Sequence, residues 1–194
     1  MKSIYTNDGS GNLTIDNNGK VHAFWGEMYV TDVTPGDGTS SYYPGRNGID
    51  YWNEGMGANT YVKGIAGCPD ENSDGTLNIT GSDAIALYYT SLSSQPSATV
   101  DNDNNLYLAY SALSESNISS GAQNYRHIIL TKSKDGGATW PEFVDVINDQ
   151  LFKDDPTFYT FAEAVFPSVI IRGNDLHLTF MMDYEPGLTV NGDL

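Results

Sequence analysis

Residues 99–110 have the sequence TVDNDNNLYLAY, in which two apolar runs flank a turn rich in Asn and Asp. Two more stretches follow the same plan: residues 14–25, TIDNNGKVHAFW, and residues 169–180, VIIRGNDLHLTF. β-Branched and aromatic residues around a short Asn/Asp/Gly turn are typical of a β-hairpin. The copies start at residues 14, 99 and 169, hence 85 and 70 residues apart. This recurrence indicates an internally repeated, all-β chain.

The second copy belongs to a longer unit with four expected strands. Period-2 alternation and β-branched content predict these strands at residues 97–101, 105–113, 125–133 and 142–147. Four antiparallel strands per repeat are typical of a β-propeller blade. The sequence therefore predicts a partial β-propeller of four-stranded antiparallel blades.

The other two units are less regular. The first has an insertion at residues 28–47 and expected third and fourth strands at 48–52 and 60–65, and an extended segment is expected at 84–89. We expect residues 1–194 to form one partial propeller domain of about two and a half blades, with units at about 12–82, 96–150 and 166–194. Because closed propellers have four to eight blades, we expect the remainder to come from a larger propeller or from neighbouring chains.

Residues 133–140, SKDGGATW, contain the sharpest motif of the chain. It resembles the Asp-box of sialidase-like, or BNR-repeat, β-propellers, whose pattern is S-x-D-x-G-x-T-W. The matching positions are Ser133, Asp135, Gly137, Thr139 and Trp140. The resemblance implies a structural turn between the third and fourth strands of a blade, away from the catalytic face. Residues 167–171 followed by 176–180 resemble a blade opening in secreted propellers, many of them bacterial surface proteins, which implies an extracellular or cell-surface location.

Sialidases resemble one another in an arginine triad, a Tyr nucleophile with its Glu, and an acid/base Asp. This chain has three arginines, Arg46, Arg126 and Arg172, and none lies in the Phe-Arg-Ile-Pro motif of the family. A surface position is favoured for each, with Arg46 and Arg172 kept as catalytic candidates. Glu163 is a further candidate, since its apolar neighbours would raise its pKa by desolvation. A purely structural role for Glu163 is the alternative.

A calcium site is suggested by the spacing of oxygen-bearing side chains in residues 70–78, DENSDGTLN. Asp70, Asn72, Asp74 and Asn78 match positions 1, 3, 5 and 9 of loops like those of EF-hands and dockerins. Position 12 is Gly81 instead of an acidic residue. A Ca²⁺ loop and a plain solvated Asx turn both fit this pattern.

Composition limits the partners. There are 9 Lys and Arg against 25 Asp and Glu, a net charge of −16, which argues against nucleic acid and anionic membrane surfaces. No apolar run is long enough to predict membrane insertion. The lone Cys68 is read as a small apolar residue. Exposed aromatic rings would suit sugar stacking, although they fill blades equally well; the candidates are Tyr42, Tyr43, Tyr51, Trp52 and Tyr184.

We therefore expect a non-catalytic, sialidase-like propeller segment that binds a glycan or a protein. Loops on a rigid scaffold, such as the 28–47 insertion, are the natural place for such binding. The alternative is part of an exo-sialidase or related glycoside hydrolase whose catalytic residues are completed outside this chain. A purely structural assembly unit is a third possibility.

Overall fold

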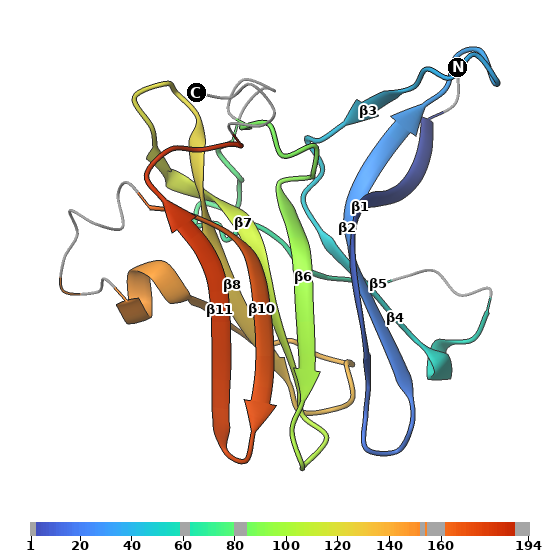
Figure 1. Ribbon diagram of the computed structural model, residues 1–194, viewed down its shortest axis with the longest axis vertical. Helices are drawn as coiled ribbons and strands as arrows, with labels where there is room; N and C mark the ends of the chain where they lie inside the picture. The colour runs from blue at the N-terminus through green and yellow to red at the C-terminus, as the bar shows by residue number, and fades with distance from the viewer. Residues whose placement is uncertain (1–2, 59–62, 80–84, 152–153, 155–161, 189–194) are drawn as a thin grey trace.

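The described residues of the protein form three antiparallel β-sheets, as the computed structural model shows (Figure 1). The structure describes residues 3–58, 63–79, 85–151, 154 and 162–188. The first sheet consists of β1 (Ser3–Ile15), β2 (Val21–Thr31), β3 (Ser41–Tyr43), β4 (Ile49–Asn53) and β5 (Lys63–Ala66). The second consists of β6 (Ser93–Val100), β7 (Leu106–Ile118), β8 (Asn124–Ser133) and β9 (Glu142–Asp145), and the third of β10 (Glu163–Arg172) and β11 (Asp175–Asp183). A 3₁₀ turn, η1 (Glu54–Met56), and a π-helical turn, η3 (Val146–Leu151), are the regular helical elements among these residues.

The predicted all-β architecture is confirmed, including the four strands of the second unit and the three repeated hairpins β1–β2, β6–β7 and β10–β11. One detail of the alignment is wrong. The pair Leu13–Ala23 is equivalent to Ala98–Leu108 and to Val169–Leu178, and eight residues separate the members of the third pair where nine separate those of the other two. The sequence comparison aligned Val169 with Thr14 and Thr99, one residue away from its structural equivalents, because the length of the connection sets the register of a hairpin.

Two other predictions need correction. Part of the expected insertion at 28–47 belongs to the sheet, since β2 continues to Thr31 and β3 pairs with its end. The described part of the expected extended segment 84–89 forms bends instead of a strand. In the expected strand at 60–65, β5 starts at Lys63, and 60–62 lie outside the described residues.

The sheets pack face to face, and their first strands β1, β6 and β10 are neighbours in space (Figure 1). Between the first and second sheets lies a core that includes Phe24, Ile49, Tyr51, Leu106, Leu108 and Tyr110. Between the second and third sheets lies another, with Ala109, Ile128, Val169, Leu176 and Leu178. The described sheets do not close into a ring, so the propeller remains a prediction.

The Asp-box residues form the turn between β8 and β9. Both carboxylate oxygens of Asp135 accept hydrogen bonds from Thr139, at 2.8 Å from its backbone N–H and 2.6 Å from its hydroxyl. These bonds lower the pKa of Asp135 to about 2. The Ser133 hydroxyl donates to Asp135 at 2.8 Å and accepts the Gly137 N–H at 2.9 Å. Trp140 packs edge-on against Phe24 of the first sheet, with ring centroids 5.8 Å apart.

Candidate functional site

The first strand of each sheet carries a β-bulge; the bulges of β6 and β10 occupy equivalent positions, and that of β1 overlaps them and is one residue longer. The pairing shifts between residues 7 and 11 in β1, 94 and 97 in β6, and 165 and 168 in β10. Gly11, Pro96 and Pro167 are equivalent, because they lie two residues before the equivalent residues Leu13, Ala98 and Val169. Bulges end the ladder locally and redirect side chains, and they are frequent beside binding and active sites.

The bulges also contain backbone in the left-handed region. Gly9 has φ +89°, which costs glycine little, but Gln95 and Phe166 have φ of 56° and 55°. For residues with a Cβ this conformation costs about 1–2 kcal/mol each, because Cβ approaches the carbonyl oxygen. Tyr89, in the bend before β6, has φ 59°. Strain of this kind persists where surrounding contacts determine it and is common at functional sites.

Hydrogen bonds join the three bulges in sequence. The Phe166 N–H donates to Oε1 of Gln95 at 2.9 Å, and the Gln95 N–H donates to Oγ of Ser10 at 3.0 Å. The Ser10 hydroxyl is in turn hydrogen bonded to that of Ser94 at 2.9 Å. Each strained residue therefore has its backbone donor satisfied by the equivalent side chain of the preceding sheet.

Asp8 binds both sides of the junction between β1 and β6. Its Oδ2 accepts bonds from Ser94 Oγ at 2.6 Å, and from the N–H and hydroxyl of Ser91 at 3.1 and 3.0 Å. Its Oδ1 accepts from the N–H and hydroxyl of Ser10 at 3.0 and 2.6 Å. Gly26 makes room for this carboxylate, since a Cβ there would lie 2.3 Å from Oδ2.

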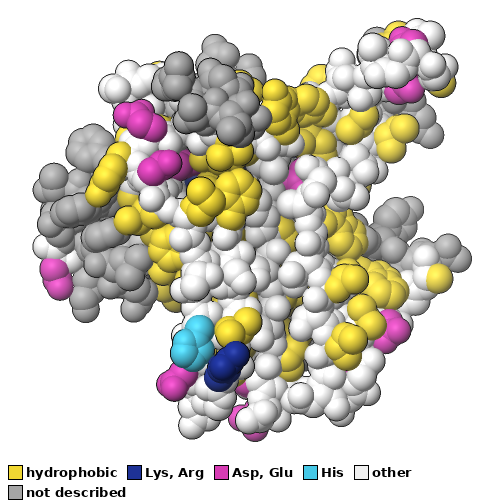
Figure 2. Space-filling view, in the orientation of Figure 1, with side chains coloured by type: hydrophobic (Ala, Val, Ile, Leu, Met, Phe, Trp, Pro, Cys, Tyr) yellow, Lys and Arg dark blue, Asp and Glu magenta, His cyan; other side chains and the backbone are white. Residues whose placement is uncertain are grey.

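An open cleft of about 580 Å³ lies over the bulges. Its lining includes the aromatic side chains of Tyr88, Tyr89 and Phe166 and the polar side chains of Asp8, Ser10 and Gln95. Tyr89 is 52% exposed and Phe166 41%, so two of the rings are available to a ligand. Figure 2 shows hydrophobic side chains gathered on the surface near the upper end of the third sheet, as aligned in Figure 1.

A buried carboxyl group lies beside this cleft. Glu163 is 1% exposed; its Oε1 accepts the Tyr88 hydroxyl at 2.7 Å and its Oε2 accepts the Arg126 N–H at 2.6 Å. Burial raises the pKa of Glu163 to about 7, as its apolar sequence setting predicts, and burial also raises the pKa of Tyr88. Both side chains line a second cavity of about 230 Å³, and Tyr88 also lines the larger cleft.

The surface position expected for Arg126 is wrong. The residue is fully buried, and its guanidinium donates to the carbonyl oxygens of Ser91 at 2.8 Å and Leu92 at 3.1 Å. It also lies 5.3 Å from the ring centroid of Tyr88. Arg126 therefore holds the bend that leads into β6, because Nη1 and Nη2 of its guanidinium both donate to backbone carbonyl oxygens of that bend.

The other two arginines have separate surroundings. Arg46 forms a 3.0 Å ion pair with Glu27 and lies 4.7 Å from the ring centroid of Tyr29. Arg172 is exposed beside the β10–β11 turn, at the opposite end of β10 from Glu163. Nine residues at ~3.3 Å each place it about 30 Å from Glu163. The structure thus does not bring Arg172 to the cleft, and neither Arg46 nor Arg172 lines it.

The proposed calcium ligands turn their oxygens toward their own loop. Asp70 accepts the Gly75 N–H at 2.7 Å, Asn72 accepts the Asp74 N–H at 2.9 Å, and Asp74 accepts the Asn78 amide at 3.2 Å. No group of three or more metal-binding His, Cys, Asp or Glu side chains occurs within the part of the chain that the structure describes. Calcium binding stays a prediction.

Sequence reasoning missed Glu115, which attaches this loop to β7. Its carboxylate accepts the backbone N–H groups of Glu71, at 2.9 Å, and Asn78. In return, Glu71 accepts the Glu115 N–H at 3.0 Å. Neither glutamate stands out in the local sequence, because the contact joins residues 44 positions apart.

The aromatic candidates divide between core and surface. Tyr51 is in the core at 1% exposure, and Trp52 is half-buried, whereas Tyr42, Tyr43 and Tyr184 are 41%, 46% and 54% exposed. None of them lines the cleft, whose rings the sequence did not single out. The available signal was the repeated Gly or Pro at positions 11, 96 and 167, just before each hairpin.

No helix among the described residues is long and apolar enough to cross a membrane. No protein-family model matches this chain, and a search of curated proteins gives no significant match.

Proposed function

We propose that the protein is part of a sialidase-like β-propeller, secreted or at the cell surface, that binds a glycan in the cleft over the three bulges. The observation that carries this proposal is the convergence of Tyr89, Gln95 and Phe166, all with positive φ, on one open cleft. Conformational strain held in place beside a solvent-accessible, partly aromatic surface is typical of a binding site.

The chemistry of the cleft suits a saccharide. The exposed rings of Tyr89 and Phe166 offer apolar faces for stacking on the C–H surface of a sugar. Beside them, Oε1 of Gln95 accepts the Phe166 N–H and has a second lone pair for a sugar hydroxyl, whereas Gln95 Nε2 is buried and the Ser10 hydroxyl is engaged with Asp8 and the Gln95 N–H. A pocket with an apolar wall and a few converging polar groups has the general character of a small-ligand site.

The charge of the cleft favours a neutral sugar over sialic acid. Asp8 is the charged residue among those that line it, and no Lys or Arg of the described chain lines it. Carboxylate recognition relies on bidentate arginine, and here Arg126 binds backbone carbonyls while Arg46 is paired with Glu27. Asp8 would repel the carboxylates of an acidic glycan, and no Lys or Arg among the described residues lines the cleft to offset this repulsion.

The test is a glycan array followed by calorimetry with the sugar that binds. Tyr89→Ala is expected to weaken binding about tenfold, equivalent to about 1.4 kcal/mol, because it removes one stacking surface. Tyr43→Ala is the matched control, since Tyr43 is similarly exposed, at 46%, but lies outside the cleft. Equal affinities for the two variants would refute the assignment of the cleft.

A second candidate is a glycoside hydrolase, favoured by the 2.7 Å contact between Tyr88 and Glu163 at the 230 Å³ cavity. A carboxyl group with a pKa of about 7 is suited to general acid catalysis near neutral pH. Aryl glycosides, neutral and sialylated, test it directly. This candidate requires turnover that Glu163→Gln abolishes while glycan binding at the larger cleft persists. Binding without turnover favours the binding module.

A further inference from the structure

Two contacts join neighbouring sheets within the protein, one between the first and second sheets and one between the second and third. Both contacts use the same pair of faces of the repeated hairpin. Leu108 of β7 and Leu178 of β11 are equivalent in register. Leu108 packs in a core with Phe24 of the preceding sheet, and Leu178 packs in a core with Ala109 of the preceding sheet. Phe24 and Ala109 are themselves equivalent. One mode of packing therefore occurs twice.

A hydrogen bond repeats along with this packing. The Ala98 N–H donates to Oδ1 of Asn12 at 3.1 Å, and the Val169 N–H donates to Oγ of Ser97 at 3.1 Å. The two donors are equivalent in register, as are the two acceptors. Each sheet thus offers a side-chain oxygen to the same backbone donor of the sheet that follows.

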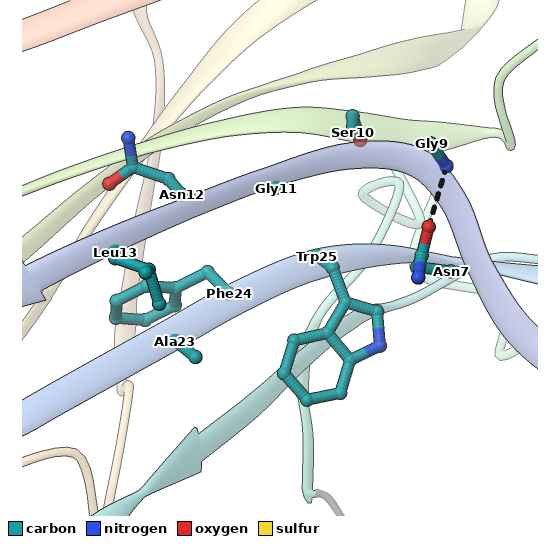
Figure 3. Close-up of a pocket in the computed structure, with 9 residues that line it drawn as sticks. All are labelled: Asn7, Gly9, Ser10, Gly11, Asn12, Leu13, Ala23, Phe24 and Trp25. Atoms are coloured by element: carbon teal, nitrogen blue, oxygen red, sulfur yellow. Dashed lines mark hydrogen bonds between the residues drawn. The ribbon is translucent and has the colours of Figure 1, made fainter.

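In the second and third sheets, one face of the hairpin packs against the preceding sheet. In the first sheet, the equivalent face is exposed. Its pair Leu13–Ala23 is equivalent to Ala98–Leu108, yet Leu13 is 70% and Ile15 63% exposed, while Leu108 is fully buried. Figure 3 shows Leu13 and Ala23 along β1 and β2, with Trp25 farther along β2. Together they line an open hollow of about 560 Å³.

The third sheet leaves uncovered the complementary face. Ser168 is the equivalent of the acceptors Asn12 and Ser97, and it is exposed. On the same sheet, Ile170 is 45% and Met181 59% exposed. The outer face of the β1–β2 sheet and the outer face of the β10–β11 sheet are therefore equivalent to the two surfaces that pack together inside the protein.

We infer that a second copy of this chain covers these faces, seating its β10–β11 sheet on the β1–β2 sheet of the first copy. The Ser168 hydroxyl of one copy then accepts the Leu13 N–H of the other, as a third instance of the repeated bond. Because the contact pairs two different faces, it either continues into a filament or closes; in a closed dimer each copy contributes both faces, and a two-fold axis relates the two equivalent contacts. The described residues of each copy form three sheets, so two copies provide six, within the four to eight of closed propellers. On the proposed propeller fold, on which this step rests, we expect a closed dimer.

Electrostatics sets the conditions under which the dimer forms. Each copy carries a net charge of −16, so the copies repel each other at low ionic strength. At ~0.15 M salt the screening length is about 8 Å, and the apolar contact dominates. Dimerisation is therefore expected to strengthen with salt, whereas an interface based on ion pairs would weaken.

Sedimentation equilibrium of the 194-residue chain at ~0.15 M salt tests this inference. The wild type is expected to be a dimer, and Leu13→Asp and Ile170→Asp are each expected to be monomers. An equimolar mixture of the two variants retains one intact contact, so it is expected to dimerise. Its dimerisation also shows that both variants are folded. Val33→Asp is the control, because Val33 is an equally exposed apolar residue, at 67%, outside both faces.

Three results would overturn the inference. One is a wild type that stays monomeric at every concentration and salt level tested. Another is dissociation by only one of the two face variants, which indicates a symmetric contact of one face with itself. The third is a mixture of the variants that remains monomeric.

Discussion

The backbone N–H of Phe166 donates a 2.9 Å hydrogen bond to Oε1 of Gln95, 71 residues earlier in the chain. Both residues have φ near +55° and each precedes a proline. The contact joins the bulges of β6 and β10 and holds two lining residues of the cleft together. It links the stability of the cleft to a single side-chain amide.

Gln95→Ala removes the acceptor of the Phe166 N–H and retains the strained backbone at position 95. The loss of one hydrogen bond is expected to lower the free energy of unfolding by about 1 kcal/mol. Glycan affinity should fall as well, because Phe166 is no longer held in place. Urea denaturation and calorimetry measure the two effects. Val33→Ala, at an exposed position outside both outer faces, is the control; a Gln95 variant as stable as this control contradicts the prediction.

Glu163 makes stability depend on pH. Its pKa is about 7 in the folded protein against 4.5 for a free side chain, so between these values the folded protein retains a proton that the unfolded chain releases. The unfolding free energy therefore falls as pH rises through this window, by about 3 kcal/mol at 1.36 kcal/mol per pKa unit.

Glu163→Gln removes this titration and preserves a neutral acceptor for Tyr88. Relative to wild type, the variant is expected to gain stability as the pH is raised from 4.5 to 7. Urea midpoints across this range measure the difference. A difference that does not change with pH would mean that Glu163 ionises in the folded state as freely as in the unfolded chain.

Gly137 in the Asp-box turn should not tolerate a side chain. Its φ is +91°, and a Cβ would lie 2.0 Å from the Tyr51 hydroxyl oxygen. Gly137→Ala is expected to lower the free energy of unfolding by about 2–4 kcal/mol, from backbone strain and displacement of a core residue. Gly136→Ala is the matched control, because Gly136 has φ +69° but open space around it. Equal thermal midpoints for the two variants would exclude the contact with Tyr51 as the cause.

The loop at residues 70–78 is expected to bind Ca²⁺ through Asp70, Asn72, Asp74 and Asn78, in exchange for the hydrogen bonds that their oxygens now accept within the loop. Titration calorimetry with calcium should give heat for the wild type and none for Asp74→Ala. Asp103→Asn, in the oxygen-rich β6–β7 turn, should bind as the wild type does. Absence of heat from the wild type identifies the loop as an Asx turn.

Several features were determined by the sequence alone. Hairpin signals are local, because alternation and turn residues act within about ten positions, so the strands of 99–110 and the Asp-box turn were readable directly. The direction of the pKa shift of Glu163 was also predictable, since the apolar residues around it in the sequence indicated a buried position.

The tertiary structure alone decided what the sheets bring together. The cleft combines residues from positions 8, 88, 95 and 166, and Arg126 is buried because its guanidinium finds carbonyl groups 34 and 35 residues away. Such contacts depend on how one sheet packs on the next, and no short stretch of sequence encodes them. The bulges likewise line one cleft only because packing brings all three together.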